Sequence, residues 1–338
     1  MRRSTSPKSR MLRAAAGVLG VSLALSACGG VTSSSGGSTD SSKPLVDLRI
    51  MVPNSAGGGY DITARTASKV MEDDKITSGA EVFNLEGAGG TVGLARTVNE
   101  KGNADLTMLM GLGVVGASYT NKSKATLTET TPIAKLIEEY GAVMVPKDSP
   151  FEDIDQLVAA WKKNPRSLSV GGGSSPGGPD HLFPMQLAQA EGIDPKQVRF
   201  VSYDGGGDLL PALLGDKIDF ATSGVGEFKD QIANGDIRVL ATSGEKAVPG
   251  VDAPSLKEAG IDLVFTNWRG VVAPPGITEA QQERLITAFE KLHATTEWKQ
   301  AMKANSWADA FETGDDFAQY LEEQDKRVAD TLGQLGLA

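Results

Sequence analysis

Residue types on which enzymes and metal sites often depend are scarce in this sequence. The 338 residues include one cysteine, Cys28, and two histidines, His181 and His293. A single cysteine cannot form a disulfide within the chain, and two distant histidines without a tight acidic cluster give no zinc or calcium spacing. We therefore expect neither a metal ion nor any other cofactor.

Basic residues are also in the minority. The chain has 33 Lys and Arg against 43 Asp and Glu, which gives a formal net charge of −10. Proteins that bind nucleic acid normally present a basic face to the phosphates, so we expect no nucleic-acid partner. The hydrophobic fraction of 40% and the length are ordinary for a soluble globular protein with two domains.

Nucleotide-binding motifs are missing or incomplete. The sequence contains no Gly-Lys-Ser or Gly-Lys-Thr of a P-loop. The segment GAGGTVG, residues 87–93, approaches the dinucleotide fingerprint, but Val92 stands where the third glycine is needed. A tight turn before a helix is the better interpretation of this segment.

One motif of serine hydrolases is present. GSSPG, residues 173–177, fits the nucleophile elbow GxSxG with Ser175 as the nucleophile. That elbow uses the backbone N–H of the next residue as an oxyanion donor, and Pro176 has no N–H. The base would be His293, inside an amphipathic segment, or His181. A secreted serine hydrolase that uses Ser175 is therefore an alternative but not the favoured hypothesis.

The first 28 residues have the pattern of an export signal. Five basic residues precede an apolar run of 14 residues that is too short to span a bilayer permanently. The run ends in LSAC, which resembles the lipobox of bacterial lipoproteins, so we expect Cys28 to be acylated. Residues 29–43, rich in Gly, Ser and Thr, should form a flexible linker.

From residue 44 onward, short apolar strands alternate with amphipathic helices, which predicts an α/β architecture with a buried parallel sheet. Residues 278–338 carry apolar positions three and four apart and are predicted to be nearly all helical. The predicted strands occupy 48–52, 80–87, 105–111, 142–146, 168–173, 198–203, 217–224 and 237–244.

The 40 glycines gather in clusters, and four clusters directly follow predicted strands, at 57–59, 111–113, 171–178 and 205–207. In open α/β sheets, ligands bind beyond the carboxyl ends of the strands. The N-termini of the following helices offer free N–H groups and partial positive charge to an anion. An acidic protein of this kind can still bind an acidic ligand.

Four side chains near these clusters each allow two interpretations. Asp61 follows a glycine cluster and can cap the helix or contact a ligand, or both. His181 more readily fixes its own loop than contacts a ligand. Trp268 is expected in packing, and Arg269 is expected to pair with an acidic residue at a domain interface rather than to clamp a ligand carboxylate.

Six segments resemble, in order and spacing, the extracytoplasmic solute receptors of tripartite tricarboxylate transporters, the Bug family. The resemblance covers residues 46–338, and the lipoprotein-like start agrees with it. This sequence departs from the family pattern at Asn54 and Ser55, where many relatives have an apolar pair, and at Asp204, where relatives often have Arg. The six segments are VPNSAGGGYDITAR, NLEGAGGTVGLA, GGGSSPGGPDHL, VSYDGGGDLLPALLGDKIDF, DAPSLKEAGIDL and WRGVVAPPGIT.

The resemblance implies a two-domain periplasmic-binding-protein fold of the Venus flytrap kind, type II, in which each domain is a mixed sheet flanked by helices. Domain 1 would comprise residues 44–142 and 268–338, and domain 2 residues 143–267, with crossings near 142–145 and 265–270. Receptors of the family hold a ligand carboxylate mainly through backbone N–H groups and waters of two strand-to-helix loops. Carried onto this sequence, those loops give the ligand-binding candidates Asn54, Ser55, Gly58, Gly59, Tyr60, Asp61, Ser174, Ser175, Gly177 and His181.

The favoured hypothesis is a monomeric, lipid-anchored, extracytoplasmic binding protein without enzymatic activity. It would capture a small carboxylate similar to a di- or tricarboxylate and deliver it to the membrane subunits of a tripartite tricarboxylate transporter. A carboxylate-sensing receptor that is not coupled to transport needs the same fold and stays an alternative.

Overall fold

The computed structural model describes residues 43–203 and 205–338, which belong to one compact unit. The predicted export signal, Cys28, residues 29–42 of the predicted linker and Asp204 lie outside the described residues.

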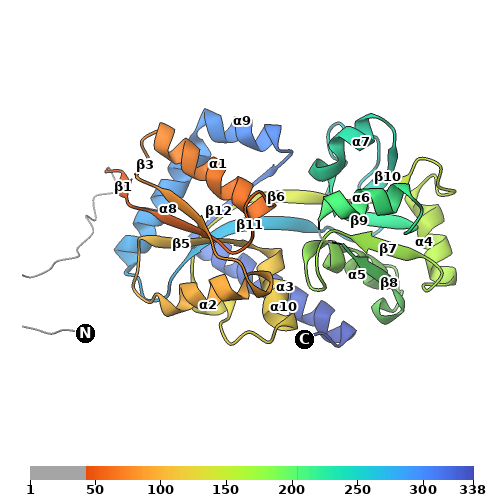
Figure 1. The fold of residues 1–338 in the computed structure, drawn as a ribbon, viewed down its shortest axis with the longest axis horizontal. Coiled ribbons are helices and arrows are strands. Elements are labelled where there is room, and N and C mark those ends of the chain that lie inside the picture. The colour runs from red at the N-terminus through yellow and green to blue at the C-terminus, as the bar shows by residue number, and fades with distance from the viewer. Residues whose placement is uncertain (1–42, 204) are drawn as a thin grey trace, which may run out of the picture. The chain divides into compact units, whose positions relative to one another are not determined.

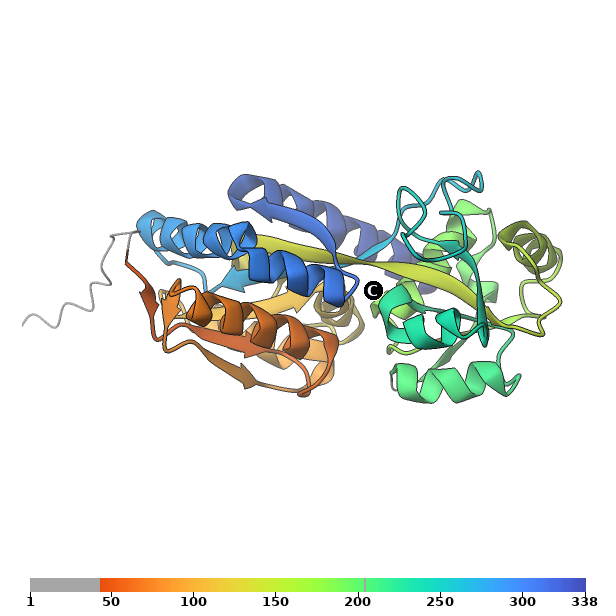
Figure 2. The same ribbon diagram turned by 90° about the horizontal axis from the view of Figure 1, so that it is seen from above.

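The described chain forms two lobes that share one long strand, β6 (Thr131–Pro146), as Figures 1 and 2 show. The first lobe combines an N-terminal and a C-terminal stretch. Its N-terminal elements are β1 (Leu45–Val46), β2 (Arg49–Val52), α1 (Gly59–Asp73), β3 (Thr77–Ser78), β4 (Glu81–Asn84), α2 (Thr91–Asn99), β5 (Leu106–Gly111) and α3 (Leu112–Thr120). Its C-terminal elements are β11 (Thr266–Ala273), α8 (Glu279–Ala294), α9 (Thr296–Ala304), β12 (Ala308–Thr313) and α10 (Gly314–Leu335).

The second lobe is formed by the chain between β6 and β11. Its elements are α4 (Ile154–Lys163), β7 (Ser169–Gly172), α5 (Pro179–Ala190), β8 (Arg199–Ser202), α6 (Gly206–Leu214), β9 (Phe220–Gly224), α7 (Lys229–Ala233) and β10 (Ile237–Thr242). Helix α10 contacts both α3 of the first lobe and α5 of the second.

Ten of the described strands form one sheet with the order β4-β2-β5-β11-β6-β9-β7-β8, and β10 and β12 pair additionally with β6. Residues 131–140 of β6 pair with β11 and β12, whereas residues 141–146 pair with β9 and β10. The strand therefore leaves one lobe and enters the other without a break, and β11 runs beside it (Figure 1).

The sheet is mixed, as the resemblance implies, which corrects the parallel sheet expected from the alternation of strands and helices. Strands β2, β4 and β5 pair in parallel, as do β7, β8 and β9, but every pairing of β6 and β11 is antiparallel. The prediction of a nearly all-helical C-terminal segment is also wrong at β12, which adds to the edge of β6. β12 pairs with residues 134–138 of β6, which lie before the segment 142–146 that the apolar run predicts.

Apolar residues alternate across the sheet and fill layers on both of its faces. In β2, Ile50 and Val52 pack toward α1 and α8, whereas Met51 packs on the opposite face toward α2 and α3. In β6, Val143 and Val145 face the layer of α4 and α5, while Met144 faces α6 and α7. This alternation with a period of two makes both faces of the sheet apolar and fixes its register.

Candidate functional site

A cavity of about 1130 Å³ lies between the two lobes, at the carboxyl ends of the parallel strands. Segments of both lobes line it, including the loop between β2 and α1, the loop between β7 and α5, and the middle of β6. This is where strand-to-helix loops of an α/β sheet gather ligand-binding groups.

Four helices begin at this cavity, and each has a glycine as its N-cap. The N-caps are Gly58 of α1, Gly111 of α3, Gly178 of α5 and Gly205 of α6. Helices α4, α8 and α9 are instead capped by the side chains of Asp153, Thr278 and Thr295. A glycine has no side chain that could accept a hydrogen bond from the first N–H groups, so these helix starts keep a donor that α4, α8 and α9 use internally.

In residues 43–203 and 205–338, the N–H groups at the start of α1 are free, whereas those at the starts of α3 and α5 are partly occupied. The hydroxyl of Tyr60 accepts hydrogen bonds from the N–H groups of Gly113 and Val114 at the start of α3. In α5, the Asp180 N–H donates to Oγ of Ser174 at 2.9 Å. Within the described part of the chain, no acceptor is bonded to the N–H groups of Gly58, Gly59 or Tyr60. The start of α1 therefore presents an open set of anion donors.

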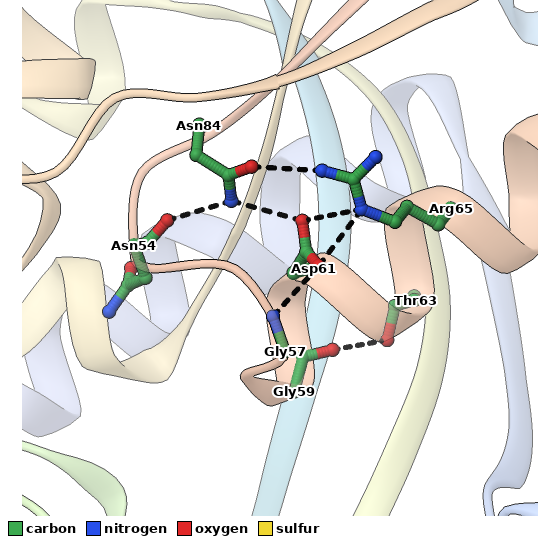
Figure 3. Close-up of polar contacts among 7 residues, drawn as sticks. All are labelled: Asn54, Gly57, Gly59, Asp61, Thr63, Arg65 and Asn84. Carbon is green, nitrogen blue, oxygen red and sulfur yellow. Dashed lines mark hydrogen bonds and ion pairs between the residues drawn. The ribbon is translucent and has the colours of Figure 1, made fainter.

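Asp61 holds the loop before α1 from behind (Figure 3). Its carboxylate accepts hydrogen bonds from the Gly57 N–H at 2.9 Å, from Arg65 Nε at 2.9 Å and from Asn84 Nδ2 at 3.0 Å. Burial raises the pKa of Asp61, but the bonds from Arg65, Gly57 and Asn84 outweigh it, so the pKa is lowered. Groups of the protein itself therefore supply the partners of the Asp61 carboxylate, which serves to stabilise the loop.

His181 has the corresponding role in the loop before α5. Its Nδ1 accepts a hydrogen bond from the Gly177 N–H at 3.1 Å, and its ring packs edge-on against Phe200. Burial lowers the pKa of His181 to about 4, so the imidazole is neutral at neutral pH and can accept this bond.

The two loops share one backbone conformation. Gly57 and Gly177 have φ of +83° and +90°, values that a residue with a side chain adopts only under strain. The next residues, Gly58 and Gly178, have φ and ψ of −76° and 170°, and of −79° and 172°. In each loop the side chain four residues after the first glycine accepts its N–H, so Asp61 and His181 are equivalent positions.

Seven of the ten candidate residues line the cavity, and three do not. Asp61, Gly177 and His181 lie outside the lining and support the loops that form it. The seven that line the cavity are Asn54, Ser55, Gly58, Gly59, Tyr60, Ser174 and Ser175.

Arg269 lies directly behind the start of α1. Its Nη2 contacts Glu139 Oε2 at 2.5 Å and its Nη1 donates to Thr63 Oγ1 at 2.9 Å. A Cβ added at Gly59 would stand 2.2 Å from that Nη2, so only glycine permits this approach. The expected pairing of Arg269 with an acidic residue is confirmed. Trp268 is fully buried against Phe317 and Tyr320, as expected for a packing residue.

Three acidic side chains that the sequence did not single out also line the cavity, namely Glu139, Asp180 and Glu227. Burial, followed by the nearby charge of Glu227, raises the pKa of Asp180 to about 8. Burial and the charge of Glu139 also raise the pKa of Glu227. Asp180 could have been found from the equivalence of the two loops, but Glu227 lies 47 residues further along the chain and gives no local signal.

The geometry gives no support to catalysis by Ser175. Within the described residues, no hydrogen bond joins Ser175 to either histidine, and His181 Nδ1 is bonded to the Gly177 N–H. In the same part of the chain, no group of three His, Cys, Asp or Glu residues is placed to hold a metal ion. No helix in residues 43–203 or 205–338 has both the length and the apolar character to cross a membrane.

Comparisons with known proteins agree on one family. The profile described as tripartite tricarboxylate transporter family receptor matches residues 64–337. The "UPF0065 protein in gbd 5'region" of Cupriavidus necator is 28% identical over 305 residues, which cover 87% of this chain and 89% of that protein.

Solved structures share the fold. A TctC solute-binding protein from Polaromonas is 24% identical, with a TM-score of 0.72, and the match covers 86% of this chain and 99% of that one. MatC from Rhodopseudomonas palustris, solved with bound malate, is 21% identical with a TM-score of 0.70 over the same shares. The fold is therefore the predicted two-domain fold of periplasmic binding proteins. The chain belongs to the family of tripartite tricarboxylate transporter receptors, which are solute-binding proteins and not enzymes.

Proposed function

We propose that this protein captures a small organic carboxylate in the cavity between its lobes and delivers it to the membrane subunits of a tripartite tricarboxylate transporter. The observation that carries the proposal is the convergence of four glycine-capped helix starts on one cavity, with free N–H groups at the start of α1. Membership of the receptor family supports it, as does the malate bound to MatC.

The carboxylate would be held by the first turn of α1. The N–H groups of Gly58, Gly59 and Tyr60 point along a helix axis whose N-terminus carries about half a positive charge. The Arg269 guanidinium, packed behind Gly59, adds positive charge close to these donors. Ser174 and Ser175 would face the ligand from the second lobe, where both line the cavity.

Closure of the lobes would exclude water from the bound carboxylate and strengthen these hydrogen bonds. The segments that would bend are residues 142–145 of β6 and 265–270 at the start of β11, because these two strands run between the lobes (Figure 2). The corresponding domains would be residues 44–142 with 268–338, and residues 143–267.

Acylation of Cys28 after removal of the export signal would tether the protein, as a monomer, to the outer side of a membrane through the linker of residues 29–43. Metabolic labelling with a palmitate analogue tests the anchor, because a Cys28→Ala variant should lose the label. Label retained in that variant would refute the lipobox assignment.

A thermal-shift screen of small carboxylates tests the binding function. A ligand that binds only the folded protein stabilises it by about 2.7 kcal/mol at one hundred times its Kd, so the unfolding midpoint must rise. Sugars, amines without a carboxylate and divalent metals serve as controls. A response to one of these controls, with none to any carboxylate, would overturn the proposal.

A further inference from the structure

The charges that line the cavity do not balance. Four charged side chains face it, namely Glu139, Asp180, Glu227 and Arg269. Arg269 is paired with Glu139, which also accepts a hydrogen bond from Trp307 Nε1 at 3.0 Å. No ion pair among residues 43–203 and 205–338 includes Asp180 or Glu227. Two carboxyl groups thus face the cavity without a cation beside them.

A single hydroxyl group separates these two carboxyl groups. Ser223 Oγ lies 3.2 Å from Asp180 Oδ2 and 3.4 Å from Glu227 Oε2, and its one proton can serve only one of them. The Gly173 N–H also donates to Asp180 Oδ2, at 2.8 Å. Within the described residues, Asp180 Oδ1 and Glu227 Oε1 receive no hydrogen bond. Two acceptor oxygens therefore remain for a group in the cavity.

The two walls of the cavity consequently differ in polarity. The first lobe offers hydrogen-bond donors, since the N–H groups at the start of α1 are free and Arg269 lies behind them. The start of α5 in the second lobe offers acceptors, since Ser174 occupies the Asp180 N–H and the Asp180 side chain adds a carboxyl group. The two equivalent loops differ at this position, because the residue that corresponds to Asp180 of the second loop is Tyr60 in the first.

An ordinary dicarboxylate would meet like charge at the second wall. Asp180, whose pKa is raised to about 8, holds a proton at neutral pH, so the like charge lies on Glu227, which would repel a second ligand carboxylate. A positively charged nitrogen at that wall would instead donate charge-assisted hydrogen bonds to both carboxyl groups and would favour their ionised forms. The cavity therefore suits a ligand with an anionic end and a cationic end.

We propose that the ligand of this receptor is a carboxylate that also carries a protonated amine, with the amine held between Asp180 and Glu227 and the carboxylate at the start of α1. The inference rests on the proposed function and narrows its ligand class. The cavity is the binding site, and the two carboxyl groups select which carboxylate occupies it.

Matched ligand pairs that differ by one amino group test this selection. Calorimetric affinities at pH 7 would be compared for succinate with aspartate, glutarate with glutamate, and butyrate with 4-aminobutyrate. At least one amino member should bind roughly tenfold to a hundredfold more tightly than its partner, as expected for a pair of charge-assisted hydrogen bonds. The preference should shrink severalfold in Glu227→Gln and in Asp180→Asn.

Glu283→Gln is the matched control, because it removes the same charge from an exposed position on α8 outside the cavity, and it should keep the preference. The unfolding midpoint of each variant without ligand shows that it folds. Glu227 is the safer of the two sites, because among the residues that the structure describes its side chain accepts no backbone hydrogen bond, whereas Asp180 accepts the Gly173 N–H. Equal or tighter binding of the amino-free members by the unmodified protein would overturn the inference and leave the proposed function standing. A preference that survives both substitutions would also overturn it. Absence of binding by every carboxylate would instead contradict the proposed function.

Discussion

Substitution of Gly116 by Ala should prevent the two lobes from meeting. Gly116 lies on α3 in the first lobe, and a Cβ there would stand 1.7 Å from the carbonyl oxygen of Gly177 in the second lobe. Both the oxygen and the carbon behind it belong to the backbone, so no side-chain rotation relieves the overlap. The lobes would have to separate by about 1.5 Å at this point to restore an ordinary contact.

The steric overlap raises the free energy only of the arrangement in which the lobes touch. Overpacking of this kind costs about 1–3 kcal/mol, which corresponds to a loss of affinity of about fivefold to 150-fold. Calorimetry would measure the Kd of a carboxylate that stabilises the unmodified protein, and small-angle scattering would measure the ligand-bound radius of gyration. Ala favours a helix over Gly by about 1 kcal/mol, which offsets part of this cost, and the unfolding midpoint without ligand shows that the variant folds.

Gly207→Ala is the control, because it makes the same change in α6 where an added Cβ meets no atom within 4 Å. It should leave the affinity and the radius of gyration unchanged. An unchanged Kd and an unchanged ligand-bound radius in Gly116→Ala would refute the idea that binding requires the lobes to meet at this contact.

Three further substitutions test the support of the site. Asp61→Ala should lower the free energy of unfolding by about 2 kcal/mol in urea titrations and weaken carboxylate binding, because the Gly57 N–H loses its acceptor. The fold lowers the pKa of Asp61, so the difference in stability between the two proteins should be complete above pH 3.8 and should vanish as the pH falls below that value. His181 stays neutral in the folded protein down to about pH 4, so the free energy of unfolding of the unmodified protein should fall by about 2–3 kcal/mol between pH 6.5 and 4. The free energy of unfolding of His181→Asn should fall much less over that range. Equal losses would contradict the neutral, hydrogen-bonded imidazole. Arg269→Met should lower the free energy of unfolding by about 3 kcal/mol, because Glu139 is left without its cation. Adding Glu139→Gln to that variant should restore part of the lost stability. Strict additivity of the two changes would contradict the pairing.

Local patterns were enough to predict the α/β architecture and the positions of the glycine loops. The short apolar strands and the glycine clusters that follow them are local signals, and the helices α1, α3, α5 and α6 begin at those clusters. Seven candidate residues line the cavity for the same reason, namely Asn54, Ser55, Gly58, Gly59, Tyr60, Ser174 and Ser175.

The first part of β6 could not be predicted because its charged residues depend on distant partners. Lys135 is buried, contacts Glu138 at 2.5 Å and lies over the ring of Tyr320 on α10. Glu139 is paired with Arg269. In the sequence these residues resemble a solvated surface, and only the tertiary structure provides the groups that neutralise them.

The acidic wall of the cavity was missed for a similar reason. Asp180 and Glu227 lie on different elements, and the hydroxyl between them belongs to Ser223 at the end of β9. Their proximity is a consequence of the sheet order β9-β7, which places the end of β9 beside the start of α5. No spacing in the sequence encodes such a pair.

A crystal structure with a bound carboxylate would show directly whether the start of α1 holds the ligand. We expect carboxylate oxygens about 2.9 Å from the backbone N–H groups of Gly58, Gly59 or Tyr60, with the lobes in contact at Gly116. A ligand that binds outside the cavity, or one whose carboxylate is held by side chains while these N–H groups remain unbonded, would contradict this expectation.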